Sequence, residues 1–520
     1  MPYTLKPFFQ EAQVPVVPDW FGEIILRHRK IADFKPRWEQ VEGLNMGFAY
    51  PNLRCALFDE QGTGKTLPAQ AFAIWQGATG NKIVCLMPRT LLRQFEGNLY
   101  FTYEGIHKHL RCEIYHGLPK ERDAQVARWS SFGAPDIVVT TPGVFMKEFE
   151  LFRLFKYQSL LMDEAKYLAN PDSKICTAVD IFMGVEGEKY AMVLNGTPAK
   201  NTLEDLYGNI KFLTPKIYHG PRHFQNKHIE YKKIAIKVRG MKSTRSDNKM
   251  RNIDVIEDYK NLDELVDNLY KQARRVEKSS LNLPPLTEDT VPFDLSEAHK
   301  AAYEEFVQQR LLEFNDGSIL DGTTSAGLRL AAFQSIMRPE ILGVNEESLL
   351  LELIEELMLD AGIEKGGMNP TKVFLMAHYQ KTIELLAERF KRFEPAIIYG
   401  KTSNPTRQKE RFMYDNDCRL LIINYQSIAG LDGIQDVSYT GICAEPTSVP
   451  GDYDQARDRL HRGGQINPVQ IYLPKPRGTL YVKAIHDLQV KKGWIDRVVS
   501  VRDFKEELLG MHDEEEVELA

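Results

Sequence analysis

The feature that most constrains this chain is a glycine-rich segment that directly follows an apolar run ending at Phe58. An apolar strand, a glycine loop and a helix-forming segment in this order are typical of a phosphate-binding loop. Backbone N–H groups and a helix N-terminus then face phosphate oxygens, the lysine reaches the terminal phosphates and the threonine binds Mg²⁺. Asp59 stands where the usual pattern has its first glycine. The residues that we expect to bind the nucleotide are Gly62, Thr63, Gly64, Lys65 and Thr66.

Apolar runs suitable for buried strands occur in two sets, with helix-forming segments between them. Near-continuous apolar strands that alternate with helices predict parallel sheets covered on both faces, and hence two doubly wound α/β lobes. The first set is Arg54–Asp59, Lys82–Pro88, Asp136–Pro142, Ser159–Asp163 and Tyr190–Asn195. The second set is Lys372–His378, Ala396–Gly400, Cys418–Tyr425, Thr440–Glu445 and Pro468–Leu473.

The domain boundaries follow from these two sets of strands and from the different residue pattern of the segment between them. Residues 222–251 carry ten basic and two acidic side chains, which either contact a polyanion or form a solvated face. Amphipathic helical stretches follow at Ala298–Phe314 and Glu346–Leu359. We expect a leader (1–33), a first lobe (34–285) with a basic and helical insertion at about 215–280, a second lobe (286–476) with a helical insertion at about 298–365, and a C-terminal extension (477–520) with an acidic tail.

Composition limits the class of protein more than its partners. The formal charge of −6 neither predicts nor excludes a nucleic-acid partner, because such binding needs only a local basic face. The six cysteines include no C-x-x-C pair, which favours buried reduced thiols over disulfides or a zinc site. No apolar run approaches the ~18 residues that span a bilayer, and no secretory leader is visible. We therefore expect a cytoplasmic protein, or one in the host cytoplasm if it is viral, without a membrane partner.

Two further groups supply the chemistry that a phosphate loop requires. Asp163 and Glu164 follow a buried strand, at the sheet edge where ligands of doubly wound folds bind. Asp163 would hold Mg²⁺ through water, and Glu164 would position and deprotonate the attacking water. Gln455, Arg459 and Arg462 have the spacing of one helix face and could direct positive charge at the transition state. The alternative is a surface helix in which Arg457 or Arg459 pairs with Asp454 or Asp458.

Together these segments resemble the Swi/Snf-type branch of the superfamily-two helicases, from about residue 34 to 475. Asp59–Thr66 matches the family's D-E-x-G-x-G-K-T, and Asp163–Lys166 resembles its D-E-A-H, with Lys166 in place of histidine. Further segments resemble the Q motif (Gln40), motif Ia (Met87–Phe95), motif Ib (Val138–Pro142), N-P-x-S-K (Asn170–Lys174), T-G-T-P-x-x-N (Leu194–Asn201), the linker block (Leu283–Tyr303), motif IV (Lys372–Gln380), motif V (Ser427–Ile434) and motif VI (Gln455–Gln465).

The resemblance implies a DNA-dependent ATPase that uses ATP and Mg²⁺ and moves on duplex DNA without sequence preference. ATP would bind between two RecA-like lobes, with Gln40 and Gln455 among the nucleotide-binding residues and Arg459 and Arg462 on the γ-phosphate. DNA would be held through its phosphates by motifs Ia, Ib, IV and V. No appended module is visible, so we expect a minimal, monomeric motor of bacterial or viral type. Replication, recombination or transcription proteins are candidate partners.

Two other functions fit the same motifs. One is an RNA-directed helicase of superfamily two, against which the linker block and the form of motif VI argue. The other is an ATP-gated binding protein that recruits or displaces a polymerase or nuclease without processive movement. ATPase stimulation by duplex DNA, single-stranded DNA or RNA would distinguish the three.

Overall fold

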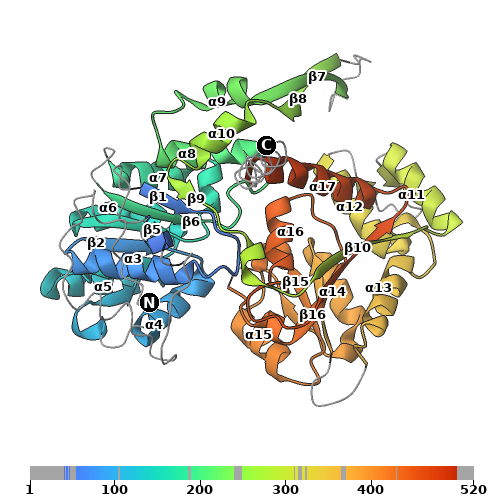
Figure 1. Cartoon of the computed structure of the whole chain (residues 1–520). Helices are drawn as coiled ribbons and strands as arrows, with labels where there is room; N and C mark the ends of the chain where they lie inside the picture. The colour runs from blue at the N-terminus through green and yellow to red at the C-terminus, as the bar shows by residue number, and fades with distance from the viewer. Residues whose placement is uncertain are drawn as a thin grey trace, which may run out of the picture. The chain divides into compact units, whose positions relative to one another are not determined.

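The computed structural model describes residues 40, 42–44, 46, 54–102, 106–184, 189–238, 249–309, 311–313, 319–321, 325–364, 371–428 and 430–499 (Figure 1). The expected leader and the acidic tail lie outside these residues. The chain divides into two compact units. Of the described residues, unit 1 comprises those up to Phe58, Thr66–Arg275 and those from Lys492 onward, and unit 2 comprises those within Asp59–Lys65 and Val276–Lys491.

Unit 1 is built on a seven-stranded sheet in the order β3-β4-β2-β5-β6-β1-β9, in which every pair is parallel. Parallel strands end at the same edge, so the loops that follow them are neighbours in space. The strands are β1 (Arg54–Leu57), β2 (Lys82–Leu86), β3 (Cys112–Ile114), β4 (Ile137–Thr140), β5 (Tyr157–Met162), β6 (Tyr190–Leu194) and β9 (Ala273–Arg274).

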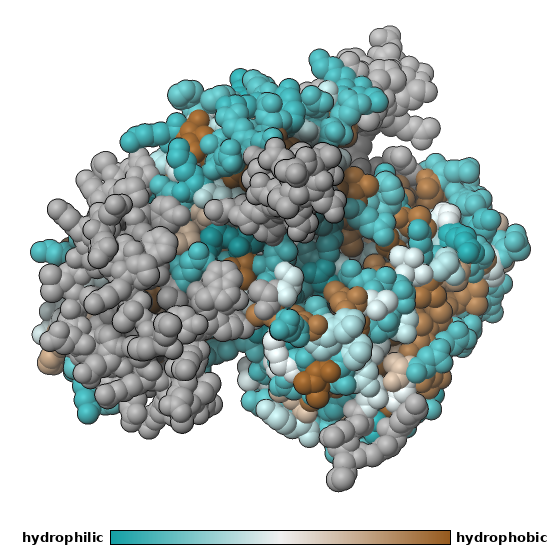
Figure 2. Space-filling view, viewed as in Figure 1, coloured by the Kyte–Doolittle hydropathy of each residue, from teal (hydrophilic) through white to brown (hydrophobic). Residues whose placement is uncertain are grey.

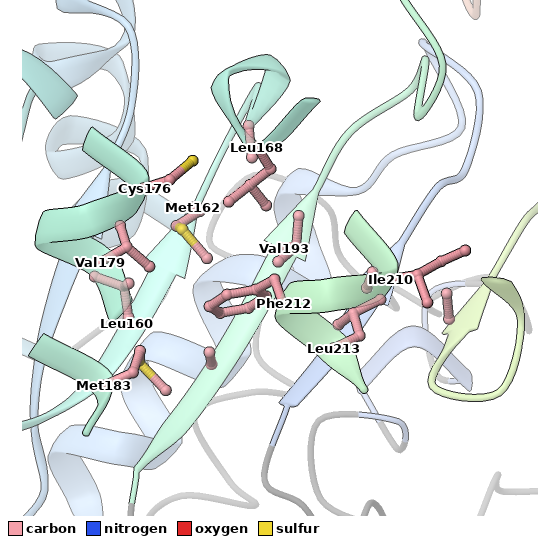
Figure 3. Close-up of a cluster of buried hydrophobic side chains, with 14 of the residues drawn as sticks. Leu160, Met162, Leu168, Cys176, Val179, Met183, Val193, Ile210, Phe212 and Leu213 are labelled. Carbon is pink, nitrogen blue, oxygen red and sulfur yellow. The ribbon is translucent and has the colours of Figure 1, made fainter. Parts of the chain in front are cut away.

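Helices cover the sheet of unit 1 and bury its apolar faces. They are α3 (Thr66–Ala78), α4 (Leu92–Thr102), α5 (Pro119–Phe132), α6 (Pro142–Leu154), α7 (Lys174–Met183), α8 (Leu206–Leu213), α9 (Pro221–His228) and α10 (Leu262–Leu269). Figure 3 shows Val179 of α7 and Phe212 of α8 over Leu160 of β5 and Val193 of β6. Each such side chain contributes about 1.5–3 kcal/mol through burial. The core therefore fixes the strand ends that carry the motifs.

The insertion of unit 1 contains the antiparallel strands β7 (Ile229–Val238) and β8 (Lys249–Tyr259) between α9 and α10. The sequence predicted helices here, and the structure adds this strand pair. Two of the basic side chains form ion pairs. Nζ of Lys232 lies 3.4 Å from Oε1 of Glu257, and Nζ of Lys227 lies 2.5 Å from Oε1 of Glu264. The surface over these elements is mostly hydrophilic in Figure 2. Residues 239–248, with several of the basic side chains, lie outside the described residues.

Unit 2 contains a six-stranded parallel sheet in the order β10-β17-β16-β13-β15-β14. Its strands are β10 (Leu286–Phe293), β13 (Lys372–Ala377), β14 (Ala396–Ile398), β15 (Leu420–Asn424), β16 (Ser438–Cys443) and β17 (Val469–Pro476). Its helices are α11 (Glu297–Gln309), α12 (Ser325–Met337), α13 (Leu349–Asp360), α14 (Gln380–Arg389), α15 (Pro405–Tyr414), α16 (Pro450–Arg457) and α17 (Leu480–Val499), whose last residues belong to unit 1. A short antiparallel pair, β11 (Leu311–Glu313) and β12 (Ile319–Asp321), lies in the helical insertion.

The two parallel sheets confirm the predicted α/β class, and all ten predicted strands occur with bounds shifted by a few residues. The division between the units falls at Arg275/Val276, whereas the sequence placed it at 285/286. The reason is that β9 pairs with β1, whereas Val276 accepts a hydrogen bond from the N–H of Glu60 in unit 2. All six cysteines are buried free thiols. Among the described residues, no helix is both long and apolar enough to cross a membrane.

Candidate functional site

The predicted phosphate loop, Asp59–Lys65, connects β1 to α3, as the sequence indicated. Gly62 and Gly64 adopt φ of 87° and 91°, a left-handed conformation that only glycine takes without strain. The hydroxyl of Thr63 donates to the carbonyl of Glu60 at 2.7 Å and closes the loop on itself. Helix α3 begins at Thr66, so the loop ends at a helix N-terminus, where backbone N–H groups favour an anion.

The ammonium group of Lys65 lies over its own loop. Its Nζ donates to the carbonyl oxygens of Asp59 and Glu60 at 2.5 and 2.8 Å. Carbonyl oxygens bear only partial charge, whereas phosphate oxygens are anionic and form stronger charge-assisted bonds. An arriving phosphate can therefore replace the carbonyls as the partner of this lysine.

Asp163 and Glu164 follow β5 and are held between the ends of its neighbours. The N–H of Asp163 donates to Leu86 at the end of β2 (2.8 Å), and that of Ala165 donates to Leu194 at the end of β6 (3.2 Å). Glu164 has φ of 49°, and its N–H donates to the Asp163 carboxylate at 2.9 Å. A left-handed glutamate costs on the order of 1 kcal/mol, and such strain concentrates at functional sites. The backbone thus orients both carboxylates.

Lys166 occupies the position at which the resemblance leads us to expect histidine. It begins a short 3₁₀ helix, η3 (Lys166–Ala169), and its Nζ lies 4.0 Å from Oε2 of Glu164. A positively charged group therefore lies next to the side chain for which the sequence predicted proton abstraction.

Other motif segments also follow strands of the same edge. Asn195 follows β6 and donates its N–H to Leu57 of β1 at 3.2 Å, and its side chain accepts from the N–H of Thr197 at 3.2 Å. Beyond β2, Arg89 and Arg93 are exposed. Gln40 is partly buried in a helical stretch. The sheet order thus brings the ends of β2, β5, β6 and β1 together.

In unit 2 the arginine-bearing segment differs from the prediction. Gln455 is buried in α16, but this helix ends at Arg457, so Arg459 and Arg462 do not share its face. Beyond the helix the backbone tightens into i→i+3 bonds, such as Arg459 N–H to Ala456 at 3.1 Å. Gly464, with φ of 99°, then turns the chain. The glycine pair thus marks a turn that carries the arginines.

Both arginines are held by Asp432, which the sequence argument did not single out. Oδ1 of Asp432 accepts from Nη1 of Arg459 at 3.0 Å and from Nη1 of Arg462 at 2.5 Å. The alternative ion pairs occur at the neighbouring Arg457, which contacts Asp454 at 2.9 Å and Asp458 at 3.1 Å. In the sequence, Asp432 is distinguished only as an acidic residue within the glycine-containing motif V segment, Ser427–Ile434.

The phosphate loop and the arginine turn both belong to unit 2, and they are in contact there. A Cβ added to Gly62 would lie 3.1 Å from Cβ of Arg462, which is tighter than ordinary packing. The carbonyl oxygen of Gly62 also lies 3.7 Å from a Cβ built on Gly463. This close approach explains the need for glycine at position 62 and places Arg462 against the loop that carries Lys65.

Glu445 lies at the carboxyl edge of the unit 2 sheet, where β16 ends beside the motif IV segment. It is fully buried and accepts from the N–H groups of His378 and Tyr379 at 2.9 and 2.8 Å and from the hydroxyl of Thr382 at 2.5 Å. Burial raises the pKa of this carboxyl to about 7, although the three hydrogen bonds oppose the shift. Glu445 therefore ties motif IV to β16.

The donor set suits a magnesium ion bound together with a nucleotide. Thr66 and Asp163 offer hydroxyl and carboxylate oxygens, the hard ligands that Mg²⁺ prefers. Within the part of the chain that the structure describes, no group of three or more His, Cys, Asp or Glu could hold a metal ion. Mg²⁺ commonly needs only one or two carboxylates plus substrate phosphates, so the two residues fit this mode.

A model of the SNF2-related domain family matches residues 38–340. Curated relatives include the CHD3-type chromatin-remodeling factor CHR7 of Arabidopsis thaliana, which is 24% identical over 85% of this chain and 35% of its own length. Another is the human SWI/SNF-related matrix-associated actin-dependent regulator of chromatin subfamily A member 1, 22% identical over 87% of this chain and 42% of its own length. The chain thus spans less than half of each relative.

Among solved structures, the Sulfolobus solfataricus SWI2/SNF2 ATPase core in complex with dsDNA is 21% identical. The match covers 91% of this chain and 95% of that one, with a TM-score of 0.39.

Proposed function

The chain belongs to the SNF2-related domain family, and from this premise we propose that it is a DNA-dependent ATPase that couples ATP hydrolysis to movement on duplex DNA. The observation that carries the ATPase assignment is the contact between the phosphate loop and the arginine turn in unit 2, at Gly62 and Arg462. A loop lysine and arginines next to it provide the positive charge that phosphoryl transfer requires.

In this proposal the γ-phosphate of ATP replaces the protein groups that bind Lys65, Arg459 and Arg462 in this structure. Lys65 exchanges two loop carbonyls for phosphate oxygens. Arg459 and Arg462 exchange the single carboxylate oxygen of Asp432 for the transition-state charge. Because each exchange replaces an existing partner, none of the three cations is left without one before ATP binds.

Asp163 and Glu164 have separate roles in the hydrolysis step. Bound Mg²⁺, held by Thr66 and Asp163, would neutralise the charge of the phosphates. Glu164 orients the attacking water and takes up its proton. The left-handed backbone at Glu164 fixes the direction of its side chain, so little reorganisation is needed during the reaction.

We assign DNA as the partner from the family and from the exposed cations of unit 1. Arg89 and Arg93 lie just beyond the carboxyl end of β2, in the segment that resembles motif Ia. Exposed arginines suit phosphate contacts, which are sequence-independent and weaken as salt rises. The linker block and the form of motif VI support duplex DNA rather than RNA as the partner.

The test is ATP turnover measured with no polymer, duplex DNA, single-stranded DNA or RNA. We expect duplex DNA to stimulate most, and Lys65→Ala to abolish turnover in every condition because the phosphates lose their cation. Triplex displacement on duplex DNA then measures translocation. Stimulation by RNA alone would contradict the DNA assignment, and DNA-stimulated turnover without displacement would favour an ATP-gated binding protein.

A further inference from the structure

Lys278 is a buried lysine that none of the sequence motifs includes. It begins the short 3₁₀ helix η5 (Lys278–Leu281) in unit 2, and its side chain is 8% exposed. Its Nζ lies 2.5 Å from Oδ1 of the equally buried Asp458 and donates to the carbonyl of His461 at 2.9 Å. Both contacts are with the turn that leads from α16 to Arg462.

The main chain around Lys278 holds the phosphate loop from the other side. The N–H of Lys278 donates to Oε2 of Glu60 at 2.9 Å, and the N–H of Glu60 donates to Val276 at 2.9 Å. The carbonyl of Glu60 is in turn one of the two oxygens that bind Lys65. One residue therefore contacts the loop through its backbone and the arginine turn through its side chain.

Within the buried pair, the charge of each side chain opposes the effect of burial on the pKa of the other. Burial alone would raise the pKa of Asp458, but the charges of Lys278 and Arg457 hold it at about 2. Burial lowers the pKa of Lys278, and the charge of Asp458 counteracts that shift. A buried charge left without its partner is strongly unfavourable, so the turn is held where the ammonium can reach both acceptors.

We propose that Lys278 is a positioning residue for ATP hydrolysis, which holds Arg459 and Arg462 in place relative to the phosphate loop. The inference rests on the proposed ATPase function. Because the side chain of Lys278 makes the contacts to Asp458 and His461, replacing it should disturb the arginines. Because the hydrogen bond from Lys278 to Glu60 comes from the main chain, the same replacement should keep that bond to the loop. Turnover and ATP affinity are therefore expected to respond differently.

The experiment compares Lys278→Met with the wild-type chain in two measurements, kcat with saturating duplex DNA and Kd for ATP. We expect kcat to fall about 10²-fold, as when a catalytic group is misplaced by ~1 Å, whereas Kd changes no more than about twofold. The matched control is Lys189→Met. Lys189 likewise donates to a carbonyl, that of Phe182 at 2.6 Å, but it lies in unit 1 at the amino end of β6. Its kcat should equal that of the wild type.

A second variant separates positioning from simple stabilisation. Lys278→Met/Asp458→Leu removes both charges of the pair, while Arg457 keeps its ion pair with Asp454 at 2.9 Å. Replacement of a buried pair by apolar side chains is often neutral or stabilising. We expect the midpoint of thermal unfolding to return to the wild-type value while kcat stays low. If the single variant does not fold, the kcat of the double variant tests the inference in its place. Wild-type kcat in the single variant, or recovery of both quantities in the double variant, would overturn the inference. A wild-type chain without ATPase activity would instead overturn the proposed function.

Discussion

Replacing Glu445 by glutamine should make unit 2 more stable at alkaline pH. The carboxyl is fully buried, and burial raises its pKa from 4.5 to about 7. A carboxyl group whose pKa is higher in the folded than in the unfolded state adds to the free energy of unfolding. This contribution is complete only below the pKa of the group in the unfolded state. That stability is lost as the pH rises through about 7, because the buried group must ionise.

The magnitude follows from the size of the shift. From 4.5 to about 7, at 1.36 kcal/mol per pKa unit, the loss reaches about 3 kcal/mol. Glutamine preserves the local hydrogen bonds, because its oxygen can accept from the N–H groups of His378 and Tyr379 and its NH₂ can donate to the hydroxyl of Thr382. It carries no ionisable proton. The free energy of unfolding of the variant should therefore exceed that of the wild type by up to about 3 kcal/mol near pH 9 and match it near pH 4.

The assay must report on unit 2 alone. Intrinsic fluorescence is unsuitable, because no tryptophan lies between Val276 and Lys491. Urea-dependent hydrogen exchange of peptides from β13 and β16 follows the strands that Glu445 joins, with wild type and variant compared at matched pH. Equal protection of the two proteins at pH 9 would refute the argument that this carboxyl is forced to ionise in a buried site.

Three further predictions concern the chemistry and the DNA contacts. Glu164→Gln should retain ATP binding but lose hydrolysis, because an amide cannot accept the proton of water; near wild-type turnover would remove Glu164 from this role. Arg462→Ala should lower turnover by about 10³-fold with DNA affinity nearly unchanged, as for an arginine finger, whereas lost DNA affinity with normal saturated turnover would place it on the DNA surface. If the insertion grips DNA, alanine at Lys232, Lys233 and Lys237 should flatten the log–log salt slope of DNA binding by about 0.9 for each phosphate that the variant no longer neutralises. Measured half-maximal DNA concentrations should then rise without a change in DNA-free ATPase; an unchanged slope would indicate a solvated loop.

Most of the strands that the sequence predicted are buried on both faces. Continuous apolar runs encode this burial locally, so the central strands of both sheets could be placed from the sequence. The strands that it missed are short or exposed. β9 has two residues and exists because Ala273 and Arg274 pair with β1, and most side chains of β10 are exposed on a sheet edge. Their position depends on distant partners rather than on a local pattern.

The same distinction applies to the candidate site. Gly62, Lys65 and Glu164 are each specified by neighbours in the chain, so motif and strand context predicted where they lie. The helix assigned to Arg459 and Arg462 was wrong, since periodicity alone does not reveal where a helix ends. The partners of these segments, such as Asp432 and Lys278, are far from them in sequence and became visible only in the folded chain.

Unit 1 includes the end of α17, and this has a consequence for the order in which the protein folds during synthesis. Trp494, Ile495 and Val498 of α17 pack against the core of unit 1, and Trp494 contacts Tyr259 with ring centroids 5.3 Å apart. These side chains leave the ribosome only after all of unit 2 has been made. Until then, the apolar side chains of unit 1 that the end of α17 covers remain exposed, although domains generally fold from the N-terminus onward. The first unit to be translated is thus the last to be completed.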